Sequence, residues 1–146
     1  LLAFRKDGEN DEPVAHINGL ETFAGENQPT NGNLSHERWR RYASPIWTDI
    51  NFSNTLNAKA ARENDDERHV CPMALDLIER AIQLWSNPGD VVFDPFSGIG
   101  STGYQAIRMG RKFAGSELKT AYFEQAVKNI GSAKANQGAL FDSEAV

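Results

Sequence analysis

The sequence predicts an α/β protein in which helices flank a partial parallel sheet, and three observations lead to this fold class. Residues 91–103 pass from a β-branched and aromatic run through Asp-Pro into a glycine-rich turn. Residues 112–117 form a second short apolar run that ends in an acid. Helical patterns precede, separate and follow these two runs, an alternation typical of parallel strands joined by right-handed crossovers. Because two strands are too few for a stable sheet, further strands must complete it.

The helix before the first strand is predicted from a proline and two apolar stripes. Pro72 suits a first helical position, and a turn at residues 88–90 ends the helix near Ser86. Large apolar residues recur at helical spacing on one face, at Leu75, Ile78, Ile82 and Trp85. A second stripe consists of Leu77, Ala81 and Leu84. We therefore expect this helix to be packed on more than one side.

The two later helices are predicted from their ends. One should run from about Ser101 to Met109, because Gly110 is a natural residue to follow a helix. The other should run over about residues 121–132, with Thr120 as its N-cap. Its inward-facing residues are expected to be Ala126, Val127 and Ile130.

Composition limits the classes of protein to consider. The chain has 146 residues, 40% of them hydrophobic, which suits one domain with a modest core. A net charge of −5 argues against a wholly basic nucleic-acid binder but leaves room for a local basic patch. A single cysteine, Cys71, excludes an internal disulfide. The histidines at 16, 36 and 69 are too scattered to predict a metal site. No apolar run is long enough to span a membrane, so we expect a cytoplasmic protein.

The glycine turn predicts a nucleoside-cofactor site at the end of the first strand. Gly98, Gly100 and Gly103 satisfy G-x-G-x-x-G, so a nicotinamide dinucleotide must be considered. Asp94 closes the strand just before the turn, however, and would repel a pyrophosphate bound there. S-adenosylmethionine carries a sulfonium, an ammonium and no phosphate, so the same carboxylate would attract it. Glu117, at the end of the second strand, could accept hydrogen bonds from the ribose hydroxyls of either cofactor.

A purely structural alternative is a tight strand-to-helix turn with both acids solvated. Three glycines together with two spaced acids at strand ends favour a binding site instead.

Residues 94–102, Asp-Pro-Phe-Ser-Gly-Ile-Gly-Ser-Thr, resemble the cofactor loop of the amino-methylating DNA methyltransferases, which act on adenine N6 or cytosine N4. Residues 68–75 resemble the segment that precedes this loop in the circularly permuted subgroup, where it runs over the methionine end of the cofactor. This segment departs from the usual form at residues 70–71 and 73–74. The resemblance implies a Rossmann-like S-adenosylmethionine-dependent methyltransferase fold, in a bacterial or phage-infected cell, with double-stranded DNA as partner.

The resemblance also implies roles for individual residues. Asp94 would hold the methionine ammonium, Phe96 would pack near the adenine or the methionine arm, and Glu117 would bind the ribose. Ser101 or Thr102 would bind the carboxylate. The complete set of expected cofactor-binding residues is His69, Asp94, Pro95, Phe96, Ser97, Gly98, Gly100, Ser101, Thr102 and Glu117.

The chemistry of this family depends on a signature that the sequence lacks. The family carries Asp, Asn or Ser followed by Pro-Pro and an aromatic residue, which polarise the target amino group and stack on the flipped base. No Pro-Pro occurs here, and residues 44–47, Ser-Pro-Ile-Trp, are interpreted as an ordinary turn into an aromatic-rich strand. We therefore expect no catalytic residue in this chain, which looks cut from a longer one and is expected to be inactive alone. The alternative is a non-catalytic cofactor- or DNA-binding module that another chain completes.

Three regions are expected along the chain. Residues 1–67 form a partly irregular target-recognition-like region and linker, residues 68–133 the cofactor-binding α/β part, and residues 134–146 a flexible tail. Arginines and aromatic residues alternate over residues 36–42, which suits either DNA contact or a short helix that tucks its aromatic residues inward. Missing strands could come from an absent N-terminal half, a second protomer or the first 56 residues. Residues 137–141, Gln-Gly-Ala-Leu-Phe, resemble peptides that dock into the bacterial sliding clamp.

Overall fold

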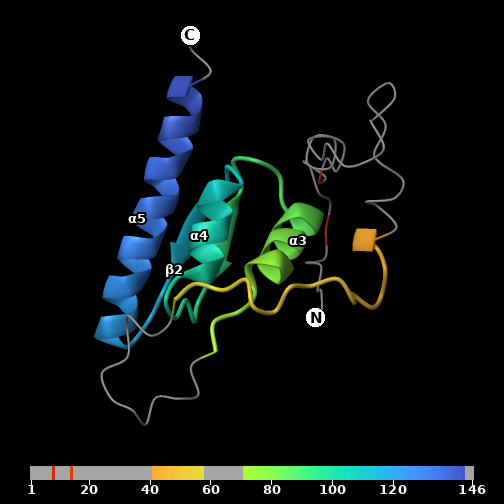
Figure 1. Cartoon of the computed structure of the whole chain (residues 1–146), viewed down its shortest axis with the longest axis horizontal. Helices are drawn as coiled ribbons and strands as arrows, with labels where there is room; N and C mark the ends of the chain where they lie inside the picture. Colours follow the sequence, from red (N-terminus) through yellow and green to blue (C-terminus); the bar gives the residue numbers. More distant parts are fainter. Residues whose placement is uncertain (1–7, 9–13, 15–40, 58–70, 144–146) are drawn as a thin grey trace.

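The computed structural model describes residues 8, 14, 41–57 and 71–143, with side chains up to residue 136. Helices and strands alternate through the carboxyl-terminal half, in the order α3, β1, α4, β2 and α5. Their bounds are Leu75–Trp85, Val91–Asp94, Ser101–Arg108, Lys112–Gly115 and Thr120–Ser143. The predicted α/β fold class with a partial parallel sheet is therefore confirmed. Figure 1 shows this half of the molecule as a small sheet beside three helices.

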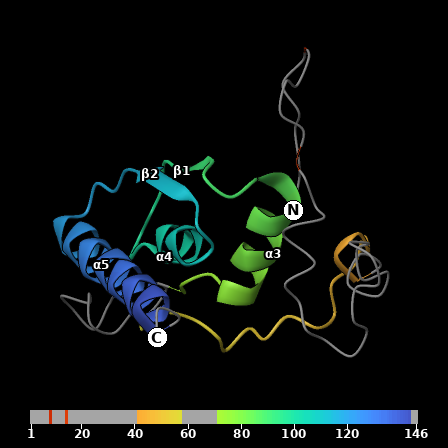
Figure 2. The ribbon, with the colours of Figure 1, turned by 90° about the horizontal axis from the view of Figure 1, so that it is seen from above.

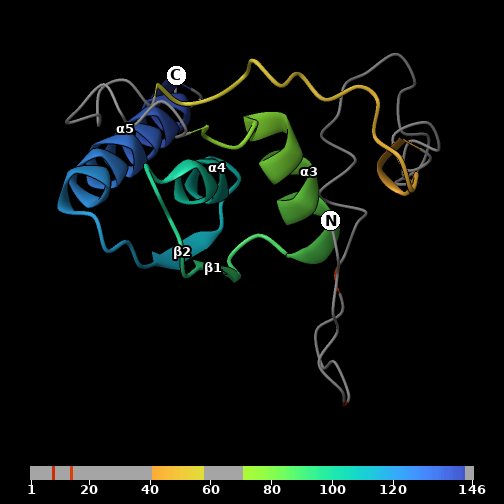
Figure 3. The same cartoon turned by 90° about the horizontal axis from the view of Figure 1, so that it is seen from below.

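Strands β1 and β2 are parallel, and α4 connects them. Their register pairs Val92 with Phe113 and Asp94 with Gly115. In Figures 2 and 3 all three helices lie on the same side of the sheet. The other side of β1 presents Val91 and Phe93, which are 62% and 67% exposed. Parallel sheets are normally covered on both faces, so this face lacks a layer among the described residues.

The main core lies between α3, α4 and the inner face of the sheet. It consists of buried apolar side chains with half-buried ones around them: Leu75, Ile78, Ile82 and Ala106, packed against Leu56, Val92, Tyr104, Met109 and Phe113. Side chains alternate between the faces of a strand, which is why Val92 and Phe113 enter this core while Val91 and Phe93 do not.

A buried arginine lies at the amino-terminal ends of the strands, at the opposite end of the sheet from the glycine turn. Arg111 donates to the Ser86 carbonyl at 2.7 Å and to the Met109 carbonyl at 2.7 Å. Burial lowers the pKa of this guanidinium, while the charge of Asp90 acts in the opposite direction. The contact ties the end of α3 to the turn that leads into β2.

Helix α3 starts later than predicted. It begins at Leu75 rather than near Pro72, because the Leu75 N–H donates to the carbonyl of Asn54 at 2.8 Å and the preceding residues are not helical. The expected double packing is confirmed, since Arg80 and Leu84 are buried along with the main apolar stripe. Trp85, expected in that stripe, is 49% exposed.

The other two helices differ from the prediction in where they end and in which side chains face the core. Helix α4 ends at Arg108, and Gly110 has the expected left-handed conformation at φ +73°. Helix α5 continues past the expected end at Ser132 to Ser143. Ala126 faces inward as predicted, but Val127 is 56% exposed. Among the described residues, no helix combines the length and apolar character needed to cross a membrane.

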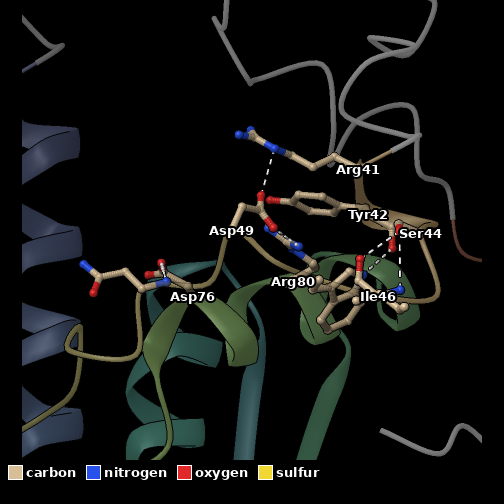
Figure 4. Close-up of polar contacts among 9 residues, drawn as sticks. Arg41, Tyr42, Ser44, Ile46, Asp49, Asp76 and Arg80 are labelled. Atoms are coloured by element: carbon tan, nitrogen blue, oxygen red, sulfur yellow. Dashed lines mark hydrogen bonds and ion pairs between the residues drawn. The ribbon is translucent and has the colours of Figure 1, made fainter.

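Residues 41–57 pass along α3 without forming a strand, contrary to the expectation of an aromatic-rich strand after Pro45. Arg80 of α3 donates to both carboxylate oxygens of Asp49, at 2.8 and 2.9 Å (Figure 4). Its guanidinium also lies 4.6 Å from the ring of Tyr42 and 5.0 Å from the ring of Trp47. The structure therefore favours the inward position for Tyr42, which is 8% exposed, while residues 36–40 lie outside the described part.

Candidate cofactor site

The candidate site is the loop that follows β1, and it begins with a turn around Asp94. The Asp94 side chain accepts a hydrogen bond from the N–H of Phe96 at 3.0 Å through Oδ1. This bond turns the chain immediately after the strand. Residues 95 and 96 are exposed, and the Phe96 ring is 86% accessible. A half-buried carboxylate and an exposed aromatic ring therefore lie side by side at the carboxyl end of β1.

Glu117 holds the loop from the neighbouring strand. Its Oε2 accepts the N–H of Gly98 at 2.8 Å, and its Oε1 accepts the N–H of Lys119 at 2.9 Å. Gly98 has φ +52°, a left-handed conformation that favours glycine. The sequence predicted Glu117 as a ribose acceptor only. In the structure the same carboxylate also shapes the loop, and each of its oxygens retains a further lone pair for a ligand.

Ser97 and Ser116 bind the loop to the end of β2. The N–H of Ser97 donates to the carbonyl of Ser116 at 2.9 Å, and the hydroxyl of Ser116 donates to the carbonyl of Pro95 at 2.7 Å. The hydroxyl of Ser97 donates to the carbonyl of Asp94 at 3.1 Å. These bonds continue the parallel pairing of the strands beyond their last residues.

Gly115 makes this approach possible. A Cβ at this position would clash with Ser97 Oγ and would lie 2.9 Å from the carbonyl oxygen of Asp94. Sequence reasoning did not identify Gly115 or Ser116 as site residues. The available signal was that two small residues directly precede the acid at the end of the second strand.

The glycines at the start of α4 allow the helix to pack closely. Gly100 is the N-cap residue with φ +81°, and a Cβ there would lie 2.9 Å from that of Ala126 in α5. A Cβ on Gly103 would lie 2.7 Å from ring atoms of Phe113 and from the side chain of Ile130. The spacing of the glycines thus serves a close strand–helix–helix contact.

The amino end of α4 supplies the remaining predicted groups. Ser101 is buried, at 7% exposure, and Thr102 is half-buried. Both lie in the first turn of α4, where backbone N–H groups have no partner within the helix and favour a negatively charged group. A carboxylate such as that of methionine fits this position.

The structure brings all but one of the predicted binding residues together around this loop. The exception, His69, lies outside the described residues. Leu118 is fully exposed next to Glu117, as Phe96 is exposed after Asp94, so each carboxylate has an exposed apolar side chain close to it in the chain. An acid on each strand end, a helix amino end and exposed apolar groups suit a ligand with a cationic part, a carboxylate and a flat ring.

The stretch interpreted as an ordinary turn behaves as one. The Ser44 hydroxyl donates to the carbonyl of Ile46 at 2.8 Å, and the N–H of Ile46 approaches Ser44 Oγ at 3.4 Å (Figure 4). The Ser44 side chain is therefore engaged within this turn. Among residues 41–57 and 71–136, no group of three His, Cys, Asp or Glu side chains could hold a metal ion.

The fold and the loop define the class of protein. A parallel strand, a glycine turn, a helix and an acid at the end of the next strand form a Rossmann-like nucleoside-cofactor domain. TTHA0409 of Thermus thermophilus, solved in complex with S-adenosyl-L-methionine, matches 75% of this chain and 40% of its own chain, with a TM-score of 0.52 and 30% sequence identity. The predicted methyltransferase fold is thereby confirmed.

The family follows from sequence. The model of the N6 and N4 methyltransferase family, described as DNA methylase, matches residues 1–128, and the chain belongs to this family. The type II methyltransferase M1.MboII of Moraxella bovis is 34% identical over 96 residues, which are 66% of this chain and 33% of that protein. The DNA adenine methyltransferase YhdJ of Escherichia coli K12 is 41% identical over 64 residues, which are 44% of this chain and 22% of that protein. The chain thus spans a third or less of the length of these relatives.

Proposed function

We propose that this chain binds S-adenosylmethionine in the loop after β1 and acts as the cofactor-binding part of an amino-group DNA methyltransferase. The observation that carries the proposal is the direct bond between Glu117 and the left-handed Gly98, which joins the two strand ends into one site with Asp94. Membership of the DNA methylase family and the likeness to a structure solved with this cofactor support it.

The charges around the loop favour this ligand over a dinucleotide. Asp94 and Glu117 place two carboxylates at the ends of adjacent strands, where the ammonium of the cofactor would meet Asp94 and the ribose hydroxyls would meet Glu117. The carboxylate of the cofactor would meet the amino end of α4. Phe96 and Leu118 would pack against the adenine or the methionine arm. A pyrophosphate would face the carboxylates instead, at a cost in electrostatic energy.

Calorimetry on the full chain tests the proposal. We expect saturable binding of S-adenosylmethionine and of S-adenosylhomocysteine, and no binding of NAD. The variant Asp94→Asn keeps an acceptor for the Phe96 N–H but removes the charge, so Kd should rise about tenfold, the change that accompanies loss of a charge-assisted contact. Glu124→Gln removes one negative charge from an exposed position on α5 and should leave Kd unchanged.

The two cofactor forms identify which positive group Asp94 meets. S-adenosylhomocysteine keeps the ammonium but lacks the sulfonium. An equal loss of affinity for both forms in Asp94→Asn would indicate the ammonium, as proposed. Absence of binding by the wild-type chain, or unchanged affinity in Asp94→Asn, would refute the assignment of this loop.

For DNA methylation itself, we propose that the chain transfers no methyl group by itself. The Pro-Pro signature is absent from all 146 residues, and the exocyclic amino nitrogen of adenine or cytosine is too weak a nucleophile without such polarising groups. Incubation with labelled cofactor and unmodified double-stranded DNA should therefore give no incorporation. Clear incorporation would show that a base pocket exists elsewhere in the chain.

A second candidate is a non-catalytic module that holds cofactor or DNA for a separate polypeptide, and the exposed outer face of β1 favours it. Val91 and Phe93 on this face are more than half exposed, whereas parallel sheets are usually covered on both sides. The covering layer would come from the rest of a methyltransferase fold, on the same or another chain, or from a second protomer. Light scattering of the chain alone and mixed with the remaining part of a relative would distinguish these sources.

Residues 137–141 are proposed as a contact for the replication sliding clamp. The backbone there is helical within α5, so docking as an extended peptide would require local unwinding. Fluorescence anisotropy of a labelled peptide of residues 134–146 with purified clamp tests the idea, and a lack of saturable binding would end it.

A further inference from the structure

We infer that Asn129 of α5 is a positioning residue for the cofactor loop, which it holds by a side-chain hydrogen bond without touching the ligand site. The inference rests on the proposed function of that loop. The Asn129 Nδ2 group donates to the carbonyl of Ile99 at 2.8 Å, across 30 positions in the chain. Ile99 is the residue between the two left-handed glycines of the turn and is 3% exposed.

The orientation of the Asn129 amide is itself fixed. Gln125, one turn earlier in α5, donates through Nε2 to Asn129 Oδ1 at 3.0 Å. This contact occupies the oxygen and directs the NH₂ group of Asn129 toward the loop. Gln125 and Asn129 thus form two hydrogen bonds in series that connect α5 to the cofactor turn.

Together with two other hydrogen bonds, the Asn129 contact holds the peptide units of the turn in fixed orientations. Glu117 holds the N–H of Gly98, and the N–H of Gly100 donates to the Ser97 carbonyl at 2.8 Å. The Ile99 carbonyl and the Gly100 N–H belong to one planar peptide unit. Asn129 therefore binds the carbonyl of this unit, and the Ser97 carbonyl binds its N–H. This unit leads directly into the first turn of α4, where the carboxylate of the cofactor is proposed to bind.

The position of these two polar side chains, next to an apolar stripe of α5, also indicates a specific role. The residues of α5 that face α4 and its preceding loop include Ala126, Ile130 and the half-buried Tyr122, which packs against Ile99. Asn129 and Gln125 lie beside this stripe and are half-buried. Apolar side chains at these two positions would leave the Ile99 carbonyl without the hydrogen bond that the Asn129 amide donates to it.

Calorimetry with S-adenosylmethionine on the full chain tests the inference. Asn129→Asp keeps the shape but replaces the donor with a carboxylate, and Asn129→Leu removes all polar atoms. Both should raise Kd about five- to tenfold, the range expected when one partly buried hydrogen bond is lost. Gln125→Ala leaves the Asn129 donor in place but frees its orientation, so a smaller rise is expected. Ser132→Ala removes a hydroxyl bond to the Asn129 carbonyl on the same helix and should leave Kd unchanged.

Amide resonances of the loop separate positioning from general stability. In nitrogen–proton spectra, the two Asn129 variants should shift the amides of Gly98, Gly100 and Ser101, while Ser132→Ala should not. Wild-type affinity and unshifted loop amides in folded Asn129→Asp and Asn129→Leu would overturn the inference. The inference would also be overturned if, in all variants including Ser132→Ala, the loss of cofactor affinity were simply proportional to the loss of unfolding free energy measured in urea. If the wild-type chain binds no cofactor, the proposed function fails, and the loop amides still decide the inference.

Discussion

Two regions of this chain are held in place by different kinds of interaction. The cofactor loop is fixed by backbone groups, two acids and close approach at glycines, with the Gly98 N–H on Glu117 and the Ser97 N–H on the Ser116 carbonyl. The segment of residues 41–57 is fixed mainly by side chains, through the ion pair of Arg80 with Asp49 and its contacts with aromatic rings.

The difference indicates how each region responds to change. A loop held by the close approach of backbone segments at glycines does not tolerate added volume, because a backbone segment cannot move aside as a flexible side chain can. A segment fixed by an ion pair depends on both partners and on pH. The loop also shapes a ligand site, whereas the described contacts of residues 41–57 attach that segment to α3.

The largest effect is expected from added volume in the loop. Gly115→Ala places a methyl group against Ser97 Oγ and the Asp94 carbonyl, so the loop or the strand must shift. We expect a loss of about 2–3 kcal/mol in unfolding free energy, typical of overpacking, and a Kd for S-adenosylmethionine more than tenfold higher, measured by urea unfolding and calorimetry. Gly131→Ala in α5 meets open space and should raise stability slightly through helix propensity. Full affinity in Gly115→Ala would show that the loop is less closely constrained than its contacts indicate.

The next effect concerns the ion pair. Arg80→Met removes two hydrogen bonds to Asp49 and the contacts with Tyr42 and Trp47, and should cost about 2 kcal/mol in unfolding free energy. Cofactor affinity should stay within twofold, because the pair joins residues 41–57 to α3 and none of its described contacts reaches the cofactor loop. Arg108→Met, at an exposed arginine over Tyr104, provides the control and should change stability by less than about 0.5 kcal/mol. A large loss of cofactor affinity in Arg80→Met would mean that the two regions are coupled.

Much of the loop region could be predicted from sequence because its determinants are local. The order of strand, glycine turn, helix and acid identified both strands and the residues from Asp94 to Thr102, and the structure brings these together with Glu117. Helix ends were less predictable. Leu75 begins α3 because it binds Asn54, a contact between residues 21 positions apart that no local pattern shows.

The inward face of α5 and the segment of residues 41–57 were beyond sequence reasoning for the same reason. Val127 fits an apolar stripe by spacing, yet packing places Asn129 closer to the loop and leaves Val127 exposed. Arg80 has the pattern of a solvated helix residue, whereas it is buried between two aromatic rings and an acid contributed by residues 41–57. Such positions depend on which segments meet in space, and composition does not reveal this.

The smallest expected effect is the dependence of the ion pair on pH. The hydrogen bond from Arg80 lowers the pKa of Asp49, partly against burial, and the charges of Arg80 and Arg41 act in the same direction as the bond. A carboxyl group whose pKa is lower in the folded state stabilises the fold above its unfolded pKa of about 3.9, and this contribution is lost as pH falls through the folded pKa. Because Asp49 is partly solvated, the contribution should be less than about 1 kcal/mol.

Urea unfolding between neutral and acidic pH measures the contribution of the Asp49 charge to stability when wild type is compared with Asp49→Asn. The difference in unfolding free energy should be constant near neutrality and should shrink at pH values below the ordinary aspartate range. Other acids titrate in the same window, but they are common to both proteins and cancel in the difference. An Asp49 difference that does not change with pH would indicate that shape rather than charge attaches residues 41–57 to α3, and the contrast between the two regions would then be one of degree.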